Sequence, residues 1–108
     1  MMTFYIKQND TRPILSATLI NSDGSVPTLS GAAVSFKMRK SGASSTTVND
    51  SAAISDAKTG EVSYTWSGSD TATVGNYEGE FQVTFAAGGV QTFPNSEYIE
   101  IEVVDDIA

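Results

Sequence analysis

Apolar residues in this chain alternate with polar residues in short runs, and turn-forming residues separate one run from the next. A period of two places successive side chains on opposite faces of a β-strand, whereas a helix repeats its apolar side chains every three or four residues. No stretch of helical length carries an apolar stripe. The pattern therefore predicts an all-β fold of seven or eight antiparallel strands.

The same alternation predicts which faces of the strands are buried. One strand carries Lys37 and Arg39 on one face and apolar residues on the other, so it is expected to be half buried. The segment 40–50 is rich in Ser, Thr, Gly and Asn, and we expect a surface loop there before a short strand at 52–54. The expected core residues are Phe36, Trp66, Phe81, Phe85 and Ile101.

The length and the number of strands favour one domain. A chain of 108 residues fits a single domain and leaves no room for a second. Seven or eight short strands in about 100 residues are typical of an immunoglobulin-like β-sandwich, in which two antiparallel sheets pack about 10 Å apart. We therefore expect residues 1–108 to form one immunoglobulin-like β-sandwich domain.

The composition excludes several kinds of chemistry. The chain has no cysteine and no histidine, so it lacks disulfides, the usual general base at neutral pH and the commonest metal ligand. The net charge of −7 disfavours binding to nucleic acid or to anionic membranes. The N-terminus does not have the pattern of a signal peptide, and no segment reaches the roughly 20 apolar residues of a membrane helix. We expect no cofactor, no metal, and synthesis in the cytoplasm.

Asp70, Gly75 and Tyr77 form the most informative short motif. An Asp, a short spacer and Gly-x-Tyr at the entry to a strand resemble the tyrosine corner of immunoglobulin-like domains, where the tyrosine hydroxyl bonds to upstream backbone. Gly79 stands where antibody domains have their second disulfide cysteine, so the topology need not be that of an antibody. The alternative is an unrelated turn that leads into a strand. Either role is structural rather than chemical.

The acidic residues are candidates for catalysis and for metal binding. Glu78 and Glu80, and likewise Glu100 and Glu102, lie two apart, so each pair shares one face of a strand. A glycosidase would need such a pair in a cleft, which nothing in the sequence builds, so we expect a solvated face and no enzyme. Calcium could be bound by oxygen ligands in loops or at the tail, but the sequence contains no stretch with the ligand pattern of a calcium site. The candidate carboxylates are those of Asp23, Asp50, Asp56, Asp105 and Asp106.

An ordered set of short motifs extends along nearly the whole chain. The first are Phe4-x-Ile6-Lys7-Gln8-Asn9-Asp10-Thr11-Arg12-Pro13, Leu15-x-Ala17-Thr18-Leu19 and Leu29-x-Gly31-Ala32-x-Val34-x-Phe36-x-Met38-Arg39. The later ones are Gly60-x-Val62-x-Tyr64-x-Trp66, Asp70-Thr71, Gly75-x-Tyr77-x-x-Glu80-Phe81, Thr92-x-Pro94 and Tyr98-x-x-Ile101. Taken in order, this set resembles the N-terminal domain of phage baseplate upper proteins.

This resemblance implies a structural protein of the bacteriophage virion, a component of the tail, baseplate or neck that anchors neighbouring virion parts through protein–protein contacts. It implies other virion proteins as partners, a homo-oligomer within a symmetric particle, and no catalytic residues. One alternative is a capsid decoration (cement) protein. Another is a carbohydrate- or receptor-binding module that stacks sugars on Trp66, Tyr64 and Tyr77 if those rings are exposed.

Two regions are predicted to form protein contacts. The first is the N-terminal strand with Phe4, Tyr5 and Ile6, where both faces look apolar. The second is the bend from Phe93 through Pro94 to Tyr98. Large aromatic side chains often carry the binding energy of an interface. The alternative for both regions is ordinary packing in the core or at its rim.

Overall fold

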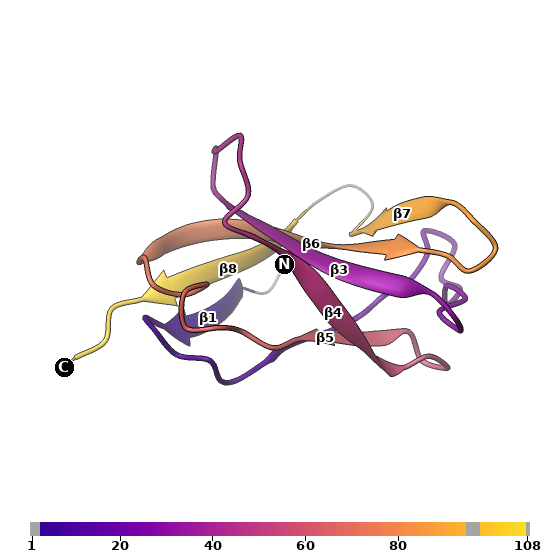
Figure 1. The fold of residues 1–108 in the computed structure, drawn as a ribbon, viewed down its shortest axis with the longest axis horizontal. Coiled ribbons are helices and arrows are strands. Elements are labelled where there is room, and N and C mark those ends of the chain that lie inside the picture. The colour runs from indigo at the N-terminus through magenta and orange to yellow at the C-terminus, as the bar shows by residue number, and fades with distance from the viewer. Residues whose placement is uncertain (1–2, 95–97, 108) are drawn as a thin grey trace.

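Eight β-strands make up the regular structure of this protein, whose computed structural model describes residues 3–94 and 98–107 (Figure 1). The strands are β1 (Thr3–Lys7), β2 (Leu15–Thr18), β3 (Ala33–Lys40), β4 (Val48–Asp56), β5 (Glu61–Tyr64), β6 (Gly75–Thr84), β7 (Val90–Phe93) and β8 (Ile99–Val104). This confirms the prediction of an all-β fold. The described residues contain no helix that could cross a membrane.

The strands form one mixed sheet that curls until it is nearly closed, like a barrel. Its order is β1-β8-β6-β3-β4-β5-β2, and β7 also pairs with β6. The prediction that all pairs are antiparallel is wrong at one place, because β1 runs parallel to β8, from Thr3↔Glu100 to Lys7↔Val104. A parallel pair needs a long crossover connection, and here nearly the whole chain separates the two strands.

β4 is the strand that bends the sheet back on itself. It pairs with β3 from Val48 to Ala52 and with β5 from Ala53 to Asp56, with a shift in register near its end. The predicted loop therefore ends sooner, and the predicted short strand is longer, than the sequence indicated. Polar residues are weak strand formers, but pairing with two neighbours overrides that local preference.

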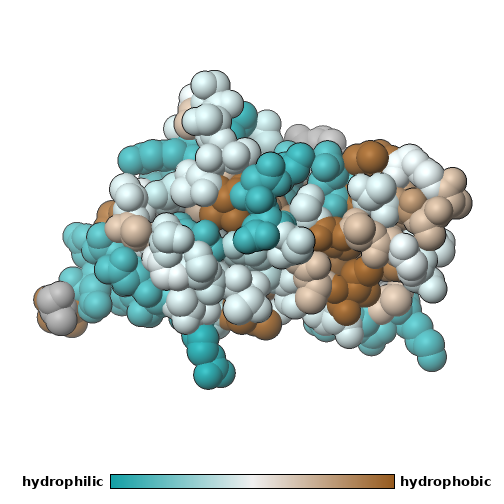
Figure 2. All heavy atoms as spheres, viewed as in Figure 1, coloured by the Kyte–Doolittle hydropathy of each residue, from teal (hydrophilic) through white to brown (hydrophobic). Residues whose placement is uncertain are grey.

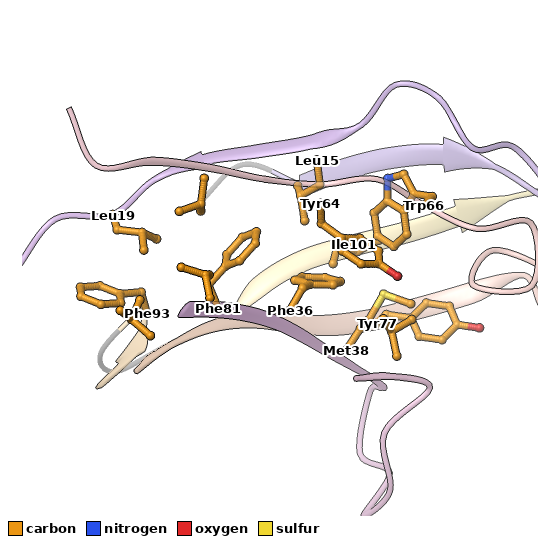
Figure 3. Close-up of a cluster of buried hydrophobic side chains, with 14 of the residues drawn as sticks. Leu15, Leu19, Phe36, Met38, Tyr64, Trp66, Tyr77, Phe81, Phe93 and Ile101 are labelled. Atoms are coloured by element: carbon orange, nitrogen blue, oxygen red, sulfur yellow. The ribbon is translucent and has the colours of Figure 1, made fainter. Parts of the chain in front are cut away.

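The core lies between the two parts of the curled sheet. Figure 3 shows side chains from β2 and β5 pointing toward those from β3, β6 and β8. The Phe36 ring lies at the centre, with its centroid 4.8 Å from that of Tyr64, 5.1 Å from that of Phe81 and 5.7 Å from that of Trp66. Phe85, another expected core residue, is only partly buried because it follows the last residue of β6.

Gly79 permits this packing at the middle of β6. A Cβ atom at this position would lie 2.7 Å from Cδ1 of Ile101 and 3.0 Å from Cε1 of Phe36. The first distance is shorter than carbon atoms tolerate and the second is at the limit, so a larger residue at position 79 would force the side chains of Ile101 and Phe36 to shift. The glycine therefore serves the core directly.

One stretch of the sheet is left open, and we call it the open seam. β7 and β8 lie one after the other along the same edge of β6, and β1 covers only β8. The outer edge of β7 and the free edge of β2 thus pair with no other described strand. Between them lies a groove of about 220 Å³, lined by Ala17, Thr18, Leu19, Ile20, Phe93, Pro94 and Ile99.

Candidate interaction surfaces

Tyr77 lies at the start of β6, where the sequence motif predicts a corner. Its ring is buried, and its hydroxyl donates a hydrogen bond of 2.7 Å to the carbonyl oxygen of Thr73, four residues upstream. Gly75, the first residue of β6, has a φ of +153°, which side-chain-bearing residues rarely adopt. Burial raises the pKa of the Tyr77 hydroxyl, so this group stays protonated at neutral pH and acts as a donor.

Asp70 organises the turn that follows β5. Its Oδ2 atom accepts hydrogen bonds from the hydroxyl of Tyr64 at 2.6 Å and from the backbone N–H of Ser67 at 2.9 Å. Burial, followed by the hydrogen bond to Asp70, raises the pKa of Tyr64 well above its ordinary value. The carboxylate is therefore occupied by structural bonds rather than presented to a ligand.

A further set of hydrogen bonds joins the end of β1 to the segment before β6. The buried hydroxyl of Thr71 donates to the carbonyl oxygen of Asp10 at 2.8 Å, and the N–H of Asn9 donates to the carbonyl oxygen of Thr71 at 3.0 Å. The side-chain amide of Gln8 donates to the carbonyl oxygen of Ala72 at 2.8 Å. We call residues 8–10 with 70–77 the fastened end. The sequence pattern does not reveal these bonds, because they join residues about sixty positions apart.

The predicted N-terminal contact strand divides between core and surface. Ile6 is buried, and Phe4 is partly buried and stacks on Trp66 with ring centroids 5.9 Å apart. Tyr5 points the other way and is 62% exposed, opposite Glu102 in the β1–β8 register. Of these three aromatic and aliphatic side chains, Tyr5 is the one available to a partner.

The predicted contact bend divides in the same way. Phe93 is buried, Pro94 is partly buried, and Tyr98 is 41% exposed. The Arg39 guanidinium lies 5.1 Å from the ring centroid of Tyr98 and donates to its hydroxyl at 3.2 Å. The Nε atom of Arg39 also forms an ion pair with Oε1 of Glu78, at 2.9 Å. Residues 95–97 of the bend lie outside the described part of the chain.

The paired glutamates lie on the outer face of the sheet. Glu78 stands directly opposite Glu100 in the β6–β8 register, and Glu80 stands opposite Lys37 in the β3–β6 register. The hollow that Glu78, Glu100 and Glu102 line is open to solvent. Within residues 3–94 and 98–107, no three acidic side chains gather closely enough to hold a metal ion.

The rings that a sugar-binding module would need are not on the surface. Trp66, Tyr64 and Tyr77 are 3%, 4% and 3% exposed, and they pack against the central phenylalanine or at the corner. A sugar could not stack on them without unfolding the core. Sugar binding through these three residues is therefore wrong.

The fold is all-β, and its conspicuous polar residues, Asp70 and Tyr77, form hydrogen bonds that stabilise turns. These features define a structural domain. The chain belongs to the BppU N-terminal domain family, which matches residues 3–107 and is named for the phage baseplate upper protein. No curated protein matches the chain. Membership implies a component of a phage baseplate upper protein, located in the virion with other virion proteins as partners, and the family is not known for enzymes.

Proposed function

We propose that this domain joins neighbouring proteins of the phage baseplate through protein–protein contacts and so anchors other parts of the tail. The family match over residues 3–107 is the observation that carries the proposal. We also propose that several copies of the chain assemble in the symmetric particle.

We further propose that residues 1–108 form one domain of immunoglobulin-like sandwich type, with β4 passing from one sheet to the other. The pairing of β2 with β5 would form one sheet, and β3, β6, β8 and β1 would form the other. The hydrogen bond from Tyr77 to the backbone of Thr73 is the bond that a tyrosine corner requires and supports this assignment.

Tyr5 and Tyr98 are the proposed anchors for neighbouring virion proteins. Both are large and exposed, and both hold a polar tip that can bond while the ring packs. Aromatic residues of this kind are enriched where interfaces have their highest binding energy. Phe4, Ile6 and Phe93 pack in or against the core, so they are not proposed as anchors.

The experiment that tests the proposal is mass spectrometry of purified particles of the phage that encodes this chain, followed by labelling with an antibody against the domain. We expect its peptides at a constant ratio to other baseplate proteins and the label at the tail tip. In particles with Tyr5→Ala and Tyr98→Ala, incorporation should fall by at least about tenfold, since two lost anchors cost several kcal/mol. Val74→Ala, an exposed change elsewhere, is the control. Complete, infectious particles without the chain would refute the proposal.

A further inference from the structure

The edge of β7 carries no charge, although the chain as a whole is strongly acidic. Residues 81–96 contain no Asp, Glu, Lys or Arg, although the whole chain has thirteen acidic and six basic residues. This stretch includes the last four residues of β6, the hairpin and all of β7. In Figure 2 the upper right-hand end of the molecule, where Figure 1 places β7 and its hairpin, is coloured white to brown.

The pairing of β7 with β6 shows which backbone N–H and C=O groups of β7 point away from the sheet. β7 pairs with β6 from Phe81↔Phe93 to Thr84↔Val90, and no other described strand lies beside it. The N–H of Phe85 donates to the carbonyl oxygen of Gly89 at 3.0 Å, so alternate residues from Gly89 onward face β6. Val90 and Thr92 therefore point their N–H and C=O groups away from the sheet.

Open strand edges are normally protected against pairing by charged side chains, by proline or by bulges. The exposed edge of β1 carries Lys7 and lies next to Glu100 and Glu102, whereas the edge of β2, across the open seam, is uncharged like that of β7. The β7 edge has only Pro94, directly after its last residue. Among the described strands, the edge of β7 is thus less protected than that of β1 and as little protected as that of β2.

We propose that β7 pairs with β7 of a second copy of this chain, antiparallel and around a two-fold axis at Gln91. Val90 then lies opposite Thr92 of the partner subunit, and the outward backbone groups of both residues are satisfied. An antiparallel edge is complementary to itself under two-fold rotation. Two copies that each carry a charge of −7 repel one another wherever carboxylates meet, and the uncharged edge avoids that repulsion.

The pairing is weak in the isolated domain and forms where copies are held close together. Four residues a side bury much less than the roughly 1,200 Å² of total area that a stable interface needs. The proposal deepens the proposed function, on which it rests, because a symmetric virion supplies neighbouring copies at high local concentration.

Covalent capture is the direct test, because the chain has no cysteine of its own. Val90→Cys protein is mixed with Thr92→Cys protein at millimolar concentration in a glutathione redox buffer. Opposed residues in the proposed register have Cα atoms about 5.5 Å apart, which suits a disulfide. Two copies of either variant alone place their cysteines farther apart than the roughly 7 Å limit. We expect mixed dimer to exceed both homodimers and the control mixture, Val74→Cys with Thr92→Cys, at least about fivefold.

A second measurement uses the unmodified chain. On concentration from micromolar to millimolar, the backbone amide signals of Val90 and Thr92 should shift in nuclear magnetic resonance spectra, and Val90→Lys should abolish the shift. Equal mixed and control dimers, or amide signals that do not change, would overturn the pairing. Neither measurement uses particles, so their failure would leave the virion assignment standing, and absence from particles would remove that assignment alone.

Discussion

The fastened end and the open seam close the curled sheet in different ways. At the fastened end, hydrogen bonds from Thr71, Asn9 and Gln8 tie the end of β1 to the segment before β6, although no strand pairing joins them. At the open seam, β2 and β7 face one another across an apolar groove with free backbone edges. Side-chain and loop bonds thus replace strand pairing at the fastened end, whereas the open seam is bridged by a longer hydrogen bond, 3.4 Å, from the side-chain amide of Gln91 in β7 to Oδ1 of Asn21, just after β2.

The two regions differ in whether their polar groups are hydrogen-bonded within the domain or left at its surface. The bonds at the fastened end include buried or partly buried groups, so their loss would leave unsatisfied donors and acceptors. The groups along the β7 edge are at the surface, where water or another chain can satisfy them. We therefore expect substitutions at the fastened end to change stability and substitutions at the seam to change assembly.

The largest effect is expected from Asp70→Ala. The change removes the acceptor of the Tyr64 hydroxyl and of the Ser67 N–H, so the free energy of unfolding should fall by about 2–3 kcal/mol. Urea unfolding followed by Trp66 fluorescence measures it. Asp105→Ala, at an exposed carboxylate near the C-terminal end of the chain, serves as the control and should leave stability unchanged. A loss below about 0.5 kcal/mol for Asp70→Ala would mean that the turn does not depend on this carboxylate.

Alkaline pH should weaken the same region. The pKa values of Tyr64 and Tyr77 are raised in the folded protein above the ordinary tyrosine value of 10.0. Their contribution to stability is therefore fully present below pH 10 and is lost as the pH rises above it, because the unfolded chain ionises first. We expect a loss of about 1–2 kcal/mol between pH 9 and pH 11. Urea midpoints over this range test it, and Tyr64→Phe should flatten the dependence.

Tyr77→Phe isolates the corner hydrogen bond. The ring stays buried and only its bond to the carbonyl oxygen of Thr73 is lost, so we expect a loss of about 1 kcal/mol without a change in fold. Urea unfolding and circular dichroism measure the two quantities. Tyr98→Phe, where the hydroxyl is exposed, is the matched control, and an equal loss in both variants would argue against a special role for the corner.

The smallest effect on stability is expected at the seam. Val90→Lys changes a side chain that is 60% exposed, so the free energy of unfolding should stay within about 0.5 kcal/mol of the original value. Val74→Lys gives the comparison at the fastened end, near the corner. If Val90→Lys destabilised the monomer strongly, the β7 edge would be part of the folding core and the contrast between the two regions would fail.

Burial of alternate side chains is a local property, and it was predicted well. Phe36, Phe81 and Ile101 were expected in the core from period two alone and are buried there. The same reasoning could not tell that Phe4 and Ile6 lie beneath Tyr5 or that Phe93 lies inside the bend, because a strand with apolar residues on both faces does not reveal which face meets the core.

The sequence by itself determined most of the strands, the buried faces of those that alternate clearly, and the family, because alternation and turn residues act over a few positions and the family motifs run along the chain. Only the tertiary structure decided the parallel pairing of β1 with β8, the continuation of β4 across the fold, the bond between Thr71 and Asp10, and the uncovered edge of β7. Each of these depends on which distant segments lie side by side, and hydrogen bonds between distant backbones leave almost no local pattern in the residues that form them.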